Sequence, residues 1–295
     1  MRVKAQMKDV MRSPQAKAAV RLALDEDLGT PWCDATSEAL VDPQAVATGE
    51  IYAKGTGCVV AGATVAAAVL KAVDPKIRVK ILKPDGSVVK PKEPILVFRG
   101  KARSILAAER TALNFMQRLS ATATLAKKFV EATKRYKTLI LDTRKTTPGL
   151  RVFEKYAVTC GGGTNHRFGM FDRVLMKDNH RRLWRGGNPD ELDQAVVAAR
   201  KKFPKLAVEV EVESLRECAS ALKARPEWIM LDNMSCADMK KCVKMCRGKV
   251  KTEASGGITL ERAKEVAATG VTAISLGCLT HSAGSIDLSL EWRIV

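Results

Sequence analysis

Between residues 208 and 277 one pattern repeats: a short apolar run ends in a charged or small residue, and a helix-like stretch follows. The runs are VEVE (208–211), IMLD (229–232), VKTE (250–253) and ISLG (274–277). Their last residues, 211, 232, 253 and 277, lie 21, 21 and 24 positions apart. This is the length of one strand-helix unit in a parallel α/β barrel. The intervening stretches 214–224, 236–246 and 260–269 have helical periodicity, and Gly270 is the expected C-cap of the last.

Two earlier runs have the same form, LILD (139–142) and VLMK (174–177). The pattern therefore predicts six strands, whereas a complete barrel has eight. Either the barrel is incomplete or two strands are hidden from pattern analysis. Reactive groups in such barrels lie at the carboxyl ends of the strands, so the charges that end these runs should meet around one mouth.

The first part of the chain has a different pattern and reads as α+β. Helical periodicity is found over 15–24, 63–73 and 104–136. The stretches expected to form short strands are 48–53, 77–82, 88–89 and 95–100. Pro84-Asp85-Gly86 marks a turn between two of them.

The chain is strongly basic, with 50 Lys and Arg against 32 Asp and Glu and a net charge of +18. This excess fits a solvated surface, a nucleic-acid footprint or a site for small anions. Its densest part is 142–185, with 10 basic and 4 acidic residues. The N-terminus has no apolar signal segment, Asp9 argues against a transit peptide, and the apolar stretch 59–70 is too short for a membrane span, so we expect a cytoplasmic protein. The eight cysteines read as reduced and structural.

Two loops in the basic stretch carry anion-binding side chains. Thr143, Arg144 and Lys145 follow a strand, where Arg can hold a carboxylate or phosphate with two hydrogen bonds; a basic turn explains them equally well. The run Gly161-Gly162-Gly163 precedes His166 and Arg167 and lets backbone N–H groups approach an anion, or is simply a flexible loop. No carboxylate or Cys is spaced in sequence to suggest metal binding by His166.

Charged residues also end or line the later strands. An apolar run leads directly into Lys177, which favours a buried position facing the site. Glu209 and Glu211 alternate and so face one side of their strand, either the barrel interior, with Lys177 and Arg144 as partners, or water at a sheet edge. Asp232 shares the strand-end position, and such carboxylates can bind Mg²⁺, hold ribose hydroxyls or stabilise a developing cation.

Small residues follow the last two strands, a composition typical of barrel phosphate sites or of close helix-strand packing. These residues are Ser255, Gly256, Gly257 and Gly277. A dicarboxylate, together with a ribose that carries both a pyrophosphate and a phosphate, fits every part of the expected cavity.

Long motifs resemble those of the quinolinate phosphoribosyltransferase family, also called nicotinate-nucleotide pyrophosphorylase (carboxylating). They are ERTALNFMQRLSATATL (109–125), DTRKTTPGLRVFEKYAV (142–158), CGGGTNHRFGMFDRVLMKDNH (160–180), VEVEVESL (208–215), IMLDNM (229–234), EASGGITLE (253–261) and ISLGCLTHSA (274–283). The resemblance implies an N-terminal α/β sandwich domain over 1–112, on which the C-terminus packs back, and an open, incomplete parallel α/β barrel over 113–295.

The resemblance also implies an activity: quinolinate and phosphoribosyl pyrophosphate give nicotinate mononucleotide, pyrophosphate and CO₂ with Mg²⁺, a step of de novo NAD biosynthesis. It implies a homodimer in which Arg110 completes the partner's site. It implies that quinolinate is held by Arg110, Thr143, Arg144, Lys145, His166, Arg167 and Lys177. Lys145, Lys177, Glu211 and Asp232 correspond to catalytic residues, with Glu211 and Asp232 also near Mg²⁺ and the ribose. Ser255, Gly256, Gly257 and Gly277 correspond to the phosphate cradle.

Two alternatives remain from the sequence. A related phosphoribosyltransferase could act on another pyridine or pyrrole base, but the set Arg110, Arg144 and Arg167 favours a dicarboxylate. A nucleic-acid-binding protein is suggested only by the charge of +18, and aromatic residues are 5% with no basic arm, so we expect neither a nucleic-acid nor a membrane partner.

Overall fold

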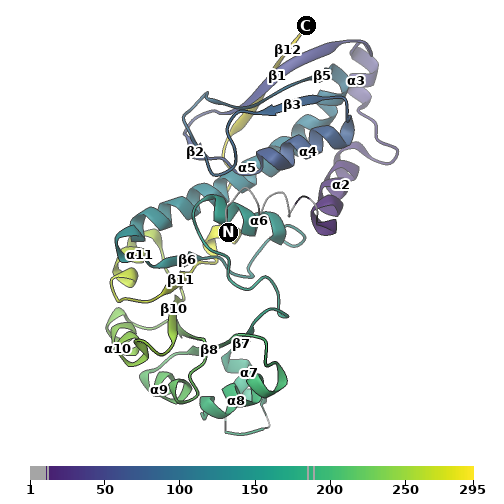
Figure 1. Cartoon of the computed structure of the whole chain (residues 1–295). Helices are drawn as coiled ribbons and strands as arrows, with labels where there is room; N and C mark the ends of the chain where they lie inside the picture. Colours follow the sequence, from purple (N-terminus) through teal and green to yellow (C-terminus); the bar gives the residue numbers. More distant parts are fainter. Residues whose placement is uncertain (1–10, 12, 185, 189) are drawn as a thin grey trace. The chain divides into compact units, whose positions relative to one another are not determined.

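The computed structural model describes residues 11, 13–184, 186–188 and 190–295 (Figure 1). The chain divides into two compact units. Unit 1 comprises Met1–Lys127, Lys145–Gly162 and Cys278–Val295, and unit 2 comprises Lys128–Arg144 and Gly163–Gly277. The domain boundary at 112/113 stays a prediction. Asp9 and Arg185, which entered the sequence arguments on targeting and charge, lie outside the described residues.

Unit 1 is built on an antiparallel sheet of four strands in the order β12-β1-β5-β3. The strands are β1 (Val46–Ala53), β3 (Arg78–Ile81), β5 (Pro94–Lys101) and β12 (Leu288–Ile294). Residues 47–53 of β1 pair with residues 288–294 of β12, so the end of the chain completes this sheet. A second ladder joins the short strands β2 (Cys58–Val59) and β4 (Val88–Val89).

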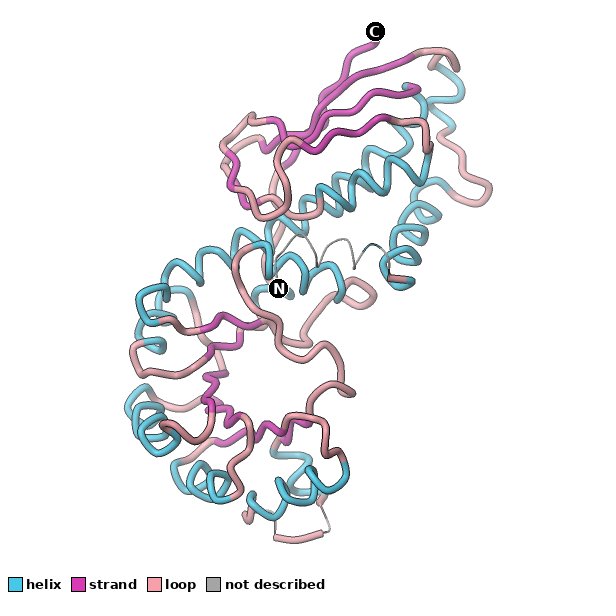
Figure 2. Tube along the Cα trace, in the orientation of Figure 1, coloured by secondary structure: helices cyan, strands magenta, loops and turns pink. Residues whose placement is uncertain are grey.

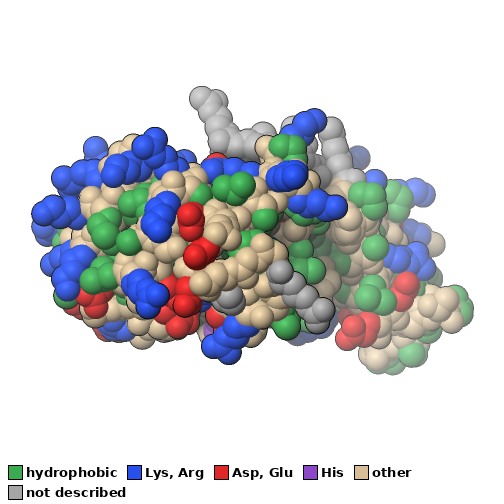
Figure 3. Space-filling model, turned by 90° about the horizontal axis from the view of Figure 1, so that it is seen from below, with side chains coloured by type: hydrophobic (Ala, Val, Ile, Leu, Met, Phe, Trp, Pro, Cys, Tyr) green, Lys and Arg blue, Asp and Glu red, His purple; other side chains and the backbone are tan. Residues whose placement is uncertain are grey.

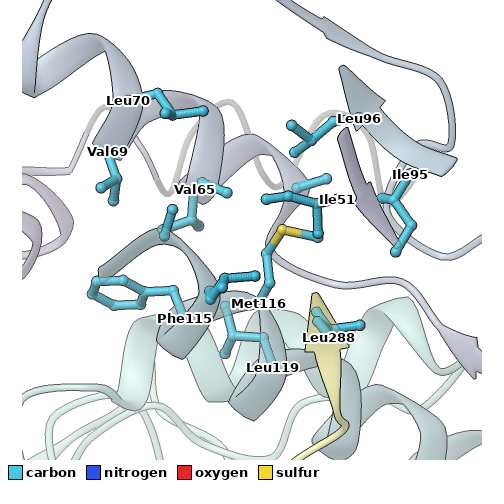
Figure 4. Close-up of a cluster of buried hydrophobic side chains, with 14 of the residues drawn as sticks. Ile51, Val65, Val69, Leu70, Ile95, Leu96, Phe115, Met116, Leu119 and Leu288 are labelled. Carbon is cyan, nitrogen blue, oxygen red and sulfur yellow. The ribbon is translucent and has the colours of Figure 1, made fainter. Parts of the chain in front are cut away.

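Helices α4 (Ala63–Val73) and α5 (Ala102–Thr133) pack against one face of this sheet (Figure 4). Unit 1 also contains α2 (Pro14–Leu28), α3 (Ala35–Leu40), α6 (Arg151–Cys160) and α12 (Cys278–His281). The end of α5 from residue 128 and the 3₁₀ turn Lys134–Tyr136 belong to unit 2. Val65 and Val69 of α4 are one turn apart and face Met116 of α5 and Ile51 of β1 in a fully buried cluster (Figure 4). Burial of these side chains supplies about 1.5–3 kcal/mol each. The core of unit 1 is therefore a sheet-helix interface.

Unit 2 contains the six predicted strands in one parallel sheet, in the order β6-β11-β10-β9-β8-β7. They are β6 (Leu139–Leu141), β7 (Val174–Met176), β8 (Val208–Val212), β9 (Trp228–Asp232), β10 (Lys251–Ser255) and β11 (Ala273–Ser275). The sheet curves into an arc with α9 (Leu215–Lys223), α10 (Cys236–Cys246) and α11 (Leu260–Ala267) on its outside (Figure 2). Two further helices, α7 (Asp178–Leu183) and α8 (Leu192–Lys202), follow β7. The prediction of an open α/β barrel is confirmed.

The edge strands of the arc are β6 and β7, and one segment runs from the first to the second. Thr164 pairs with Leu141 of β6 in an isolated parallel bridge, and the chain enters β7 at Val174. We call Thr164–Arg173 the crossing segment. It places the residues after the glycine run beside the open side of the sheet.

Some helix ends differ from their predictions: α2 runs to Leu28 instead of residue 24, and α5 ends at Thr133 instead of residue 136. The helix expected over 260–269 ends at Ala267, and Ala268 is its C-cap. Gly270 lies beyond it with φ +88°, where it terminates the turn that leads into β11. Gly270 as C-cap is therefore wrong, because the last turn opens two residues earlier. No helix of the described residues is long and apolar enough to cross a membrane.

Candidate functional site

The carboxyl ends of all six parallel strands lie at one edge of the sheet in unit 2, and most of the predicted site residues are found there. Along the order of the strands these are Thr143 and Arg144 after β6, Gly277 after β11, Ser255, Gly256 and Gly257 at β10, Asp232 at β9, Glu211 at β8 and Lys177 at β7. Ser255 and Asp232 are direct register partners. One sheet edge thus carries cations, carboxylates and a glycine loop.

Lys177 and Glu211 form an ion pair across β7 and β8. The Lys177 Nζ donates to Glu211 Oε2 over 2.8 Å, and Glu211 is buried. Lys177 was expected to be buried, but its side chain is 47% exposed. The expectation is wrong because the residue lies one position past the last strand residue, where only Nζ reaches inward. Lys177 therefore has a charged end that is open to a ligand as well as paired.

Arg144 and Arg167 lie close enough to influence each other. Burial and the positive charge of Arg144 lower the pKa of Arg167. The guanidinium of Arg167 is also tied to its own loop, because its Nη1 donates to the carbonyl of Arg173 over 3.2 Å. Arg144 and Arg167 repel each other at this edge, and an anion bound between them would offset the repulsion.

Asp142 connects the loop of Arg144 to the loop of Arg167. It is fully buried at the end of β6. Its two carboxylate oxygens accept hydrogen bonds from the backbone N–H of His166, over 2.8 Å, and from the Asn165 Nδ2, over 2.6 Å. The carboxylate therefore fixes the start of the crossing segment against β6.

Beneath the strand-end edge lies a buried cluster of His166, Glu209, Glu253 and Arg173. The His166 Nε2 is 3.2 Å from Glu209 Oε2 and 3.4 Å from Glu253 Oε2. Arg173 Nη1 donates to Glu209 Oε2 over 2.9 Å. The ligand atoms of His166 and the two glutamates lie within 4.8 Å of one another, but Arg173 already places a cation on Glu209. We therefore interpret the cluster as ionic.

Burial and charge act in opposite directions in this cluster. Burial alone would lower the pKa of His166, but Glu209 and Glu253 raise it above its usual value. The backbone N–H of Arg167 donates to His166 Nδ1 over 2.7 Å, so the other ring nitrogen, Nε2, faces the two glutamates. Burial favours a raised pKa for Glu209, yet His166 and Arg173 hold it low, whereas burial raises the pKa of Glu253.

The glycine loop after β10 is held tightly against the loop after β9. Gly256 has φ +98°, and a Cβ there would lie 2.1 Å from Asn233 Oδ1. Asn233 itself has φ +54°, donates its backbone N–H to the carbonyl of Ser255, and donates its Nδ2 to Asp232. Gly257 has φ +55°, and a Cβ there would meet nothing within 4 Å. A side chain at position 256 would collide with Asn233. Position 257 has room for a side chain and favours glycine only because its φ is positive.

Arg110 and Lys145 belong to unit 1. Arg110 is exposed on α5, and Lys145 is exposed directly after Arg144 in the chain. The backbone carbonyl of Lys145 accepts a 2.6 Å hydrogen bond from Thr280 Oγ1, and the carbonyl of Thr280 accepts one from Arg118. The buried carboxylate of Glu154 pairs with Arg118 and accepts the backbone N–H of Thr147. This network fixes the chain next to Lys145.

Two family models together match nearly the whole chain. The N-terminal domain of quinolinate phosphoribosyl transferase matches residues 34–120, and the C-terminal domain matches residues 122–291. The chain belongs to the quinolinate phosphoribosyltransferase family.

Individual members of the quinolinate phosphoribosyltransferase family agree over the same length. The chain is 39% identical over 290 residues to the chloroplastic nicotinate-nucleotide pyrophosphorylase (carboxylating) of Oryza sativa subsp. japonica, covering 93% of this chain and 77% of that protein. A probable enzyme of the same name from Bacillus subtilis is 39% identical over 90% of this chain and 89% of its own. The structure of the nicotinate-nucleotide pyrophosphorylase from Francisella tularensis superposes with a TM-score of 0.89 at 40% identity, covering 96% of this chain and 99% of that one.

Proposed function

We propose that this member of the quinolinate phosphoribosyltransferase family transfers the phosphoribosyl group of phosphoribosyl pyrophosphate to quinolinate with loss of CO₂. The products are nicotinate mononucleotide, pyrophosphate and CO₂. The observation that carries the proposal, besides family membership, is the pair of cations Arg144 and Arg167 at the strand-end edge, where burial first and then the positive charge of Arg144 lower the pKa of Arg167. A dicarboxylate relieves the repulsion between the two cations, whereas a monocarboxylate neutralises only one charge.

Binding of quinolinate is assigned to the cations at this edge. Arg144 and Arg167 offer planar donors for the two carboxylates, and the free side of Lys177 Nζ adds a third positive charge. Thr143 adds a hydroxyl beside Arg144, and Lys145 follows in the chain. The pyridine nitrogen is then oriented toward the ribose carbon, which Asp232 and Glu211 flank at β9 and β8.

The carboxylates stabilise the charge that develops on the ribose. When pyrophosphate departs, the anomeric carbon becomes oxocarbenium-like, and Glu211 and Asp232 face it from neighbouring strands. The pyridine nitrogen forms the new bond and becomes cationic. The electron pair of the breaking C–CO₂ bond stays on the ring carbon, beside that cationic nitrogen, and a proton then replaces CO₂. These steps need no covalent nucleophile from the protein.

The same two carboxylates suit Mg²⁺. Hard oxygen ligands from one or two carboxylates, completed by water and substrate phosphates, are what Mg²⁺ uses in phosphate-binding sites. Glu211 and Asp232 provide that donor set at adjacent strand ends. Bound there, the ion would neutralise the leaving pyrophosphate. Lys177, already paired with Glu211, holds that carboxylate in place.

The 5′-phosphate is assigned to Ser255, Gly256, Gly257 and Gly277. Replacing Gly256 by alanine forces Asn233 away and strains the backbone, so we expect a loss of about 2–4 kcal/mol in the free energy of unfolding and a raised KM for phosphoribosyl pyrophosphate. Gly257→Ala is the matched control and should cost only about 1 kcal/mol, because the space is open. Urea denaturation of both variants measures the difference, and equal losses would contradict the crowding argument.

Assembly and location follow the same assignment. Arg110 is exposed on α5, so a homodimer lets Arg110 from a second copy complete the site. A cytoplasmic location is part of the proposal, although relatives include chloroplastic and mitochondrial proteins.

Lys and Arg are scattered over the face shown in Figure 3, with Asp and Glu among them, rather than forming one continuous track. This distribution favours small anions over nucleic acid.

One assay tests the activity. Quinolinate labelled in its 2-carboxylate and nicotinate are each supplied with phosphoribosyl pyrophosphate and Mg²⁺. We expect labelled CO₂ and nicotinate mononucleotide from quinolinate, and at least a hundredfold lower product formation from nicotinate, since one of two Arg-carboxylate interactions is then missing. Equal turnover of both bases would overturn the assignment of quinolinate.

A further inference from the structure

The interior of unit 2 holds more acidic groups than the proposed chemistry uses. Asp142, Glu209 and Glu253 have no exposed surface. Burying a carboxylate costs several kcal/mol of folding free energy unless it is paired, so we expect a buried carboxylate to have a structural or functional role. Glu253 lies on β10, two residues before Ser255, and is not assigned to any substrate.

The crossing segment has little backbone support, so it needs side-chain contacts with the barrel interior. It connects the edge strands, and after the bridge at Thr164 it has no strand ladder in the described part of the chain until β7. Its tip is exposed at Met170 and Phe171. In a complete barrel further strands would hold this position with backbone hydrogen bonds. Here Arg167, a proposed quinolinate ligand, depends on side-chain contacts for its place.

Both ends of the crossing segment are fastened to the buried acids. His166 points between Glu209 and Glu253, and Arg173 reaches Glu209. Both ring nitrogens of His166 face protein groups, since Nδ1 accepts the Arg167 backbone N–H. The ring thus links the carboxylates directly to the backbone of Arg167.

We propose that Glu253 is a positioning residue which, through His166, clamps the crossing segment to the barrel interior and so sets the place of Arg167 for quinolinate. In this assignment His166 transmits the effect of Glu253 to the backbone of Arg167. The proposal rests on the proposed role of Arg167. It predicts that the damage from removing Glu253 is confined to quinolinate.

The experiment compares Glu253→Gln and Glu253→Ala by steady-state kinetics. Alanine removes one of the two carboxylates that face His166, and we expect KM for quinolinate to rise about tenfold, with KM for phosphoribosyl pyrophosphate changed less than about twofold. Glutamine keeps an acceptor oxygen and should recover part of the loss. Glu227→Gln is the matched control: it binds the Val208 N–H and Arg200 at the opposite end of the sheet. It should change stability without changing either KM.

A double-mutant cycle with Arg167→Ala identifies the route. If Glu253 acts through Arg167, Glu253→Gln has little further effect on quinolinate KM once Arg167 is gone. Additive effects, an equal rise in both KM values, or an unchanged quinolinate KM in folded Glu253→Gln would each overturn the proposal. If Glu253→Ala does not fold, Glu253→Gln alone decides. Failure of the proposed function has a different signature, because Arg167→Ala by itself would then leave quinolinate KM unchanged.

Discussion

Replacing Glu211 by alanine is expected to lower kcat by about a hundredfold or more while the KM values change little, because its negative charge is needed most when the ribose becomes cationic. The charge is preorganised: Glu211 is buried on β8 and held by Lys177 over 2.8 Å. Removing it leaves Lys177 half-exposed and able to take water, so the fold should survive.

Steady-state kinetics with both substrates and thermal denaturation together check this expectation. Glu265→Ala is the control, because Glu265 is exposed on α11, on the outside of the sheet (Figure 2). Its kcat should stay within about twofold of the parent, as is usual for an exposed substitution away from a site. An unchanged kcat in folded Glu211→Ala would remove Glu211 from the mechanism.

Replacing Arg144 by alanine should mainly weaken quinolinate binding. Loss of a charge-assisted, two-point contact with a carboxylate costs roughly 1.5–3 kcal/mol, or about 10- to 150-fold in affinity. The variant also removes the positive charge that, after burial, lowers the pKa of Arg167, and it leaves Arg167 without this neighbouring cation. Binding of phosphoribosyl pyrophosphate should be little affected.

Titration calorimetry with quinolinate measures this loss directly, independently of turnover. Arg216→Ala is the matched control, an exposed arginine on α9, outside the strand-end edge. Affinity for quinolinate equal to that of the parent chain in Arg144→Ala would contradict the placement of the dicarboxylate.

The strands of unit 2 could be predicted because most of them are apolar runs that must be buried by helices on the outside of the sheet, and because β10, which is more polar, keeps the same spacing. Helices α4 and α10 also match their predicted bounds, 63–73 and 236–246. In contrast α6 had no start signal, since its N-cap is Leu150 with no side-chain hydrogen bond. The sequence of β12 has no alternation of apolar and polar residues along its whole length, because only Leu288 and Leu290 near its start are buried.

The candidate site also contains residues whose positions could be predicted and contacts that could not. Strand-end residues such as Glu211 and Asp232 could be located from the period of the repeat alone. The partners of Glu209 could not, because Arg173 and His166 approach from a loop whose path no periodicity describes. The one usable signal was the burial implied for Glu209, which demands a counter-charge but does not name it. Glu253 was visible only as the end of an apolar run.

The pairing of β12 with β1 has a consequence for biosynthesis. The strand that covers one edge of β1 lies more than 200 residues later in the sequence, so residues 46–53 leave the ribosome long before residues 288–294 exist. At ordinary translation rates the interval is roughly 10 to 50 seconds. Throughout that time the backbone of β1 presents an unpaired edge, the kind that recruits other nascent chains or chaperones. Completion of the sheet in unit 1 therefore waits until β12 has been synthesised.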